Sequence, residues 1–118
     1  MLQLSAYKRT LLFRLFTWMD VVLIDWEPQA RTRKHDHGKS FGLIFHTGGK
    51  LFEVRKGKLI ISKAPWLLLE FPDIAHIAGN MSAEKKARSL HIYIPQLNMN
   101  FFDDTSEDLE ILEKVSTK

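Results

Sequence analysis

The stretch His35-Asp36-His37-Gly38-Lys39-Ser40-Phe41-Gly42 places two histidines one residue apart on an extended segment. Side chains alternate along a strand, so both imidazoles point to the same face. Two imidazoles on one face can hold a transition metal, but tight binding needs a further ligand. We expect His76 to supply it, because the strands of a small β-barrel bring distant residues together at its mouth.

Length and composition indicate one globular domain with a modest core. The chain has 118 residues, of which 45% are hydrophobic and 26% charged. We expect a core barrel over 7–96 and a tail with a short helix over 97–118. The net charge of +3 is mild, and its basic clusters contain no interleaved aromatic residues, so we do not expect a nucleic-acid partner.

The chain contains no cysteine, which excludes disulfides, thiolate metal ligands and cysteine nucleophiles. That composition fits a cytoplasmic protein. An apolar run extends from Leu11 to Trp26, but Arg14, Asp20 and Asp25 interrupt it. A spanning helix needs about 20 mostly apolar residues, so we expect no membrane span. No small-residue cleavage site follows the run, so we expect no signal peptide.

Short strands separated by turns predict an all-β barrel or double-sheet roll. Gly48-Gly49 joins two strands as a hairpin, and Thr105 or Ser106 is expected to cap a C-terminal helix. The tryptophans are expected in the core. The predicted strands cover 7–16, 18–26, 41–47, 50–55, 58–63, 66–71, 74–78 and 87–94.

The strand 87–94 alternates most clearly. Leu90, Ile92 and Ile94 share one face, which is expected to meet the core. Ser89, His91 and Tyr93 share the other face, where they align three hydrogen-bonding side chains.

Together these segments resemble the cupin superfamily, and more narrowly the thiol dioxygenases typified by cysteine dioxygenase. The resemblance spans residues 7–96 and rests on Tyr7-Lys8-Arg9, His35 to Gly42, Gly49-Lys50-Leu51-Phe52-Glu53, His76 to Asn80 and Ser89-Leu90-His91-Ile92-Tyr93-Ile94-Pro95. It implies a double-stranded β-helix (jelly-roll) fold and Fe(II) held by His35, His37 and His76. It also implies that O2 oxidises L-cysteine, or a similar small thiol, to the sulfinic acid. Three imidazoles accept Zn, Ni or another divalent metal as readily as Fe.

The resemblance assigns roles to further residues. Arg9, with Tyr7 beside it, matches the arginine that binds the substrate carboxylate. Tyr93 matches the tyrosine whose hydroxyl reaches the metal-bound ligands, with His91 and Ser89 supporting it as catalytic residues. The alternatives are an ordinary strand-edge arginine and a solvated polar face on an edge strand.

The expected metal site lacks a carboxylate. Many cupins carry a glutamate four or five residues after the histidine pair, where this chain has Phe41 and Gly42. Three neutral imidazoles would leave Fe(II) its full charge, which favours binding of a thiolate. Gly42 also stands where animal members carry a cysteine linked to the tyrosine, so that cross-link cannot form here.

Two departures from the family affect the expected assembly and activity. Few residues precede Tyr7, and the interval from Glu53 to His76 is short for the family. Both would expose apolar strand surface, so we expect a homodimer. The alternative to an enzyme is a non-catalytic metal-binding cupin that binds a small ligand or stabilises a partner.

Overall fold

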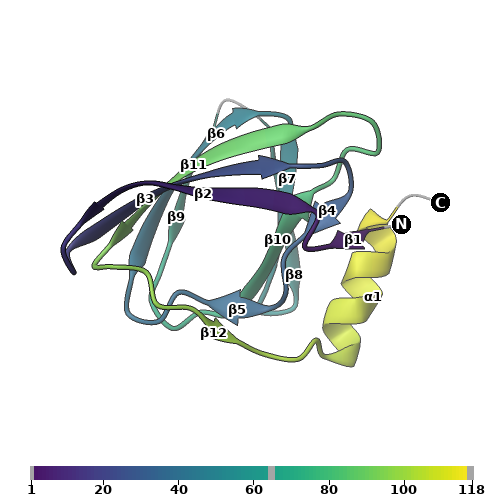
Figure 1. Cartoon of the computed structure of the whole chain (residues 1–118). Coiled ribbons are helices and arrows are strands. Elements are labelled where there is room, and N and C mark those ends of the chain that lie inside the picture. The colour runs from purple at the N-terminus through teal and green to yellow at the C-terminus, as the bar shows by residue number, and fades with distance from the viewer. Residues whose placement is uncertain (1, 64–65, 117–118) are drawn as a thin grey trace.

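The computed structural model describes residues 2–63 and 66–116, and their strands form two sheets that face each other (Figure 1). The five-stranded sheet has the order β2 (Tyr7–Leu15), β3 (Met19–Trp26), β11 (Ala87–Ile94), β6 (Phe41–Gly48) and β9 (Trp66–Glu70). The other sheet contains β1 (Gln3–Leu4), β4 (Ala30–Arg31), β5 (His35–Asp36), β7 (Lys50–Arg55), β8 (Lys58–Lys63), β10 (His76–Asn80) and β12 (Asn100–Phe101). The predicted strands agree with these bounds to within two residues, and β1, β4, β5 and β12 are short additions.

Alternation of burial shows which face of each strand lies inside. Along β3, Val22, Ile24 and Trp26 are buried, whereas the residues between them are half-buried on the outer face. β11 follows the same pattern, with Ser89 and Tyr93 on its buried face. The expectation that Leu90, Ile92 and Ile94 meet the core is therefore wrong. The polar face of β11 lines the interior of the barrel, and its apolar face points outward.

Apolar side chains from both sheets fill the interior at one end. This core cluster contains Val22, Ile24, Trp26, Ala30, Leu51, Ala87 and Tyr93. Trp26 is buried as predicted, but the prediction for Trp18 is wrong because its side chain is 68% exposed beside the β2–β3 turn.

The helix α1 (Ser106–Val115) covers the outer face of the sheet that contains β7 and β10. Leu112 and Val115 pack against Phe52, Val54 and Ile77 of those strands. Thr105 caps the helix, as expected from the sequence. Figure 1 shows no corresponding element over the five-stranded sheet within the described part of the chain. In residues 2–63 and 66–116, no helix is long and apolar enough to cross a membrane.

Candidate metal centre

The register of β5 and β10 brings His35 and His76 together. The two residues are direct cross-strand partners, and His37 follows His35 by two positions, so it shares the same face. Nε2 of His76 lies 3.2 Å from Nε2 of His35 and 3.3 Å from Nε2 of His37. Three imidazole nitrogens from two remote parts of the sequence therefore converge on one point in the barrel interior.

Asp36, between the two histidines, holds the local backbone. Its Oδ1 accepts hydrogen bonds from the backbone N–H of Gly38 (3.0 Å) and from Nδ2 of Asn100 (2.9 Å). Gly38 has a φ of +59°, and a Cβ there would lie 2.5 Å from the backbone oxygen of Asn98. Glycine is therefore required at this turn, which directs the segment after the histidine pair away from the site.

The other ring nitrogen of each histidine faces an oxygen atom. Nδ1 of His35 lies 2.7 Å from the carbonyl oxygen of Arg33, and Nδ1 of His76 lies 2.5 Å from Oε1 of Glu53. Nδ1 of His37 lies 2.7 Å from Oε2 of Glu70. Metal-binding histidines commonly have such an oxygen partner on the nitrogen that does not bind the metal. The donor set therefore fits a divalent metal bound by the three Nε2 atoms.

The expectation of a site without carboxylates is wrong. Glu53 on β7 and Glu70 on β9 are both buried beside the histidines, and Oε2 of Glu70 lies 3.5 Å from Nε2 of His76. Glu53, Glu70 and His76 form a second group of possible ligand atoms within 4.8 Å of one another. The sequence does contain a signal, because Glu53 lies between apolar residues within its strand and Glu70 ends a strand that is otherwise apolar.

Unsatisfied buried atoms also fit a site that binds a cation. Oε2 of Glu53 and Oε2 of Glu70 have no hydrogen-bond partner in the described part of the chain. The 2.7 Å contact between Glu70 and Nδ1 of His37 lacks the alignment of a hydrogen bond, so that nitrogen is unsatisfied too. Leaving such groups unpaired costs free energy, and a divalent metal would offset that cost.

Charge is distributed unevenly among the site residues. Burial and, to a lesser extent, the neighbouring His76 together lower the pKa of His35 to about 3, so His35 is neutral. Burial opposes charge on His76 and Glu70 as well. Even so, their mutual attraction raises the pKa of His76 and lowers that of Glu70. Without a metal, a proton on His76 balances the buried carboxylates, and a bound cation would take over that role.

The face of β11 carries a chain of hydrogen bonds that ends beside the histidines. Ser89 Oγ lies 2.6 Å from Nε2 of His91, and Nδ1 of His91 lies 2.9 Å from the hydroxyl of Tyr93. The Tyr93 ring packs against His37 with a centroid separation of 5.0 Å. Burial lowers the pKa of His91 to about 3 and raises that of Tyr93 well above its usual value. His91 is therefore neutral and Tyr93 keeps its proton.

The indole of Trp26 determines which atoms donate in this series of hydrogen bonds. Its indole N–H, which can only donate, bonds to Ser89 Oγ at 3.0 Å. Among the described residues, the acceptor within reach of the buried Ser89 hydroxyl proton is Nε2 of His91. His91 then donates from Nδ1 to Tyr93, which leaves the phenol proton free to point into the cavity. The sequence prediction assigned Trp26 to packing alone and missed this contact.

Arg9 and Tyr7 line the same narrow cavity as the three histidines, His91 and Tyr93. Tyr7 packs on Trp26, with ring centroids 5.1 Å apart. Nη1 of Arg9 lies 3.4 Å from the sulfur of Met99, a weak acceptor that leaves the guanidinium available to an anion. All eight residues singled out from the sequence thus surround or support one cavity.

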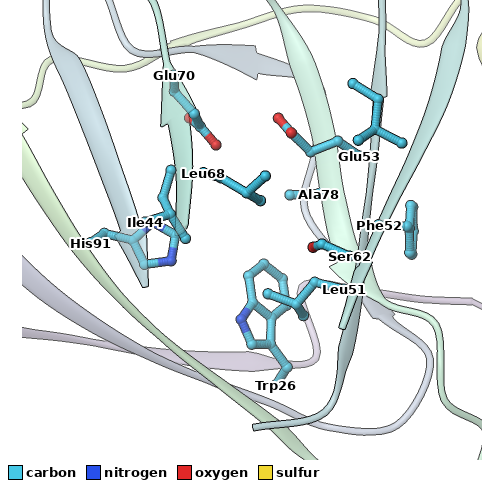
Figure 2. A pocket seen from close by; sticks show the side chains of 11 residues that line it. Trp26, Ile44, Leu51, Phe52, Glu53, Ser62, Leu68, Glu70, Ala78 and His91 are labelled. Carbon is cyan, nitrogen blue, oxygen red and sulfur yellow. The ribbon is translucent and has the colours of Figure 1, made fainter. Parts of the chain in front are cut away.

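A second cavity lies deeper in the barrel. Its walls are mostly apolar, and Figure 2 shows the carboxylates of Glu53 and Glu70 pointing toward each other at one end of it. Trp26 and His91 also reach this space. The two glutamates therefore separate the metal centre from an apolar interior.

Comparison with known proteins identifies the fold. No family model matches the chain. Two similar solved structures are an uncharacterized conserved protein with a double-stranded β-helix domain from Klebsiella pneumoniae subsp. pneumoniae and a cupin-like protein from Thermotoga maritima. The first has a TM-score of 0.74 at 16% identity and covers 85% of this chain and 87% of its own. The second has a TM-score of 0.74 at 21% identity, over 90% and 84% of the two chains.

A cupin 2 domain-containing protein from Halorhodospira halophila is also similar, with a TM-score of 0.73 at 14% identity over 93% of this chain and 78% of its own. These likenesses confirm the predicted cupin-like double-stranded β-helix fold. Together with the geometry above, the chain has a cupin fold with a buried histidine and glutamate cluster that could bind a divalent metal.

Proposed function

We propose that this protein is a metal-dependent thiol dioxygenase that oxidises L-cysteine, or a similarly small thiol with a carboxylate, to the sulfinic acid. The supporting observation is that Arg9 and Tyr93 line the same cavity as the three histidines. A carboxylate-binding cation, a protonated phenol and a candidate metal site thus share one small space.

The reaction is balanced by the thiol and O2 alone. Both oxygen atoms form bonds to sulfur as the O–O bond breaks, so sulfur loses four electrons and O2 gains four. The product is the sulfinic acid, which carries the former thiol proton until it ionises. When bound by His35, His37 and His76, Fe(II) would supply the redox chemistry that allows O2 to react with the thiol.

The residues of the chain would bind and orient the substrate. The planar guanidinium of Arg9 would bind its carboxylate through two parallel hydrogen bonds. The Tyr93 hydroxyl would donate a hydrogen bond to the reacting end of the substrate, with His91 and Ser89 holding its orientation. Tyr93 and the three histidines are buried, which would strengthen the interactions at that end of the cavity, whereas Arg9 is exposed.

Product analysis tests the proposal. Protein loaded anaerobically with Fe(II) is mixed with L-cysteine and O2, and the expected product is cysteine sulfinate at one mole per mole of O2 consumed. A comparison with cysteamine, which is L-cysteine without its carboxylate, then tests the arginine. We expect L-cysteine to be preferred in the native protein, and equal rates with both thiols would remove the case for Arg9.

A second candidate function is a non-catalytic metal-binding cupin. The observation that favours it is the Glu70 carboxylate, which lies inside the site where a substrate would need room. Stoichiometric metal binding without O2 consumption would support this candidate against the dioxygenase.

A further inference from the structure

We propose that Glu70 is a fourth protein ligand of the metal, supplied by β9 in place of the carboxylate that the histidine motif lacks. The proposal rests on the metal site described above and adds a residue that does not belong to that motif. Glu70 is 6% exposed and its Oε2 is unpartnered within the described residues, so a buried acceptor is aimed at the site.

The register of the five-stranded sheet explains how Glu70 reaches the site. Gly42 on β6 pairs with Glu70 on β9 and, on its other side, with Tyr93 on β11. A Cβ at position 42 would lie 3.3 Å from Cβ of Glu70 and 3.1 Å from Cε1 of Tyr93. Glycine thus leaves open the space into which the Glu70 side chain extends. The carboxylate that other cupins carry near the position of Gly42 would here come from Glu70 on the neighbouring strand β9.

The distance from Glu70 to His76 fits coordination, and Glu70 and the histidine pair each group with His76 as possible ligands. Oε2 of Glu70 lies 3.5 Å from Nε2 of His76, comparable to the 3.2 and 3.3 Å that separate the histidine nitrogens. Adjacent ligands of a six-coordinate ion with bonds of about 2.1 Å lie about 3.0 Å apart.

A fourth protein ligand would reduce the number of coordination positions that the metal has left for substrate, O2 or water. A six-coordinate metal would keep two exchangeable positions instead of three, and the carboxylate would neutralise part of its charge. The native site should therefore bind fewer exchangeable waters than a site made of three histidines alone.

The test uses the protein loaded with Co(II) for crystallography and with Mn(II) for water-proton relaxation. We expect an oxygen of Glu70 at about 2.0–2.2 Å from the ion. Glu70→Gln should bind metal at least tenfold more weakly and gain one exchangeable water, whereas Glu110→Gln on the exposed face of α1 should change neither. An ion bound by the three histidines with Glu70 beyond 3 Å would overturn this proposal and leave the thiol dioxygenase intact. Coordinated Glu70 without sulfinate formation would contradict only the dioxygenase.

A different observation supports a second inference, that the outer face of the five-stranded sheet binds a second copy of the chain. Two cross-strand rows on this face are almost wholly apolar. One row contains Phe13, Val21, Ile92, Leu43 and Leu69, and the next contains Thr10, Leu23, Leu90, Phe45 and Leu67. Phe41 and Ile94 extend the surface, and each is at least half exposed.

The size and charge of this face suit a copy of itself. Phe13, Phe41, Phe45, Leu67, Leu69 and Ile94 are about half exposed, and the apolar residues between them are less exposed. Together they offer about 700 Å² of apolar area, near the 800 Å² that each partner of a stable complex buries. A single monomer seldom exposes so large a patch. One end carries a charged row, in which Arg88 Nε lies 2.6 Å from Oδ1 of Asp25 and Lys8 is the other neighbour of Asp25. Because this row contains both positive and negative side chains, the row of one copy can pair its charges with the opposite charges of a second copy related by a twofold axis.

Sedimentation and light scattering measure the oligomeric state directly. We expect the native protein to be a dimer at micromolar concentration and Phe45→Glu to be a monomer that still binds metal, which shows that it is folded. Leu109→Glu changes a leucine on α1 that is 52% exposed, compared with 41% for Phe45, and should remain a dimer. A native monomer, or a Phe45→Glu dimer, would overturn the inference.

Discussion

Glu53 accepts a hydrogen bond from Nδ1 of His76 at 2.5 Å, across the neighbouring antiparallel strands β7 and β10. Both side chains are buried, so the carboxylate fixes the ring orientation that aims Nε2 at His35 and His37. Glu53 is thus a positioning residue for the metal centre.

Replacing Glu53 by glutamine should weaken metal binding. The amide keeps the shape of the side chain but is a poorer acceptor for the imidazole N–H, and loss of such a partner typically costs 10- to 100-fold in affinity. Competition with a chelator for Zn(II) measures the change. Glu110→Gln is the matched control, and an unaltered affinity in Glu53→Gln would show that the ring is held by other contacts.

Arg9→Ala should raise the KM for L-cysteine by about tenfold or more, because a charge-assisted pair contributes about 1.5–3 kcal/mol. The kcat should fall less, since Arg9 binds the substrate carboxylate in the ground state and the transition state alike. Steady-state O2 consumption gives both constants. Lys8→Ala removes a neighbouring cation that points away from the cavity and should leave them unchanged. An equal effect of both variants would indicate a general electrostatic contribution.

Tyr93→Phe should leave metal binding intact and slow sulfinate formation by about 100-fold, in the range expected for a lost proton donor. Ser89→Ala should have a smaller effect in the same direction, because Ser89 acts on Tyr93 through His91. Single-turnover measurements on Fe(II)-loaded protein separate this step from binding. A phenylalanine variant with native rates would exclude the phenol from the reaction.

Local patterns in the sequence predict much of this fold. The period-two alternation of residues 87–94 identified the strand and separated its two faces, but it assigned the apolar face to the core, whereas the polar face lines the interior. The helix start at Thr105 was predictable for a similar reason, since a capping box depends on four consecutive residues. The histidine motif indicated three residues whose ring nitrogens do converge.

The carboxylates could not be placed from local patterns. Glu70 reaches the site because β9 pairs with β6 in a register that puts it opposite Gly42, and that register is set by the whole sheet. Glu53 depends likewise on the pairing of β7 with β10. The exposure of Trp18 was missed because its large apolar ring was assigned to the core, although it lies beside the predicted break between the strands 7–16 and 18–26. The catalytic and binding roles of the site residues stay predictions.

The start of α1 provides a prediction on stability and pH. Oδ2 of Asp108 accepts hydrogen bonds from the backbone N–H of Thr105 (3.0 Å) and from Nζ of Lys34 (2.8 Å). Burial alone would raise the pKa of Asp108, but these bonds outweigh it and lower the pKa below the ordinary value. The carboxylate therefore stabilises the fold above the unfolded-state pKa of about 4, and this stabilisation is lost as the pH falls through the folded-state pKa.

Asp108→Asn should lower the free energy of unfolding by about 1 kcal/mol at pH 7, the usual contribution of a helix cap. The difference from the native protein should shrink at pH 3 and vanish at lower pH, since the native carboxylate is then protonated as well. Urea denaturation at several pH values measures this convergence. Glu110→Gln, exposed on the same helix, should change stability little at any of them. A penalty for Asp108→Asn that stays constant down to pH 2 would mean that the cap acts through its shape and not through its charge.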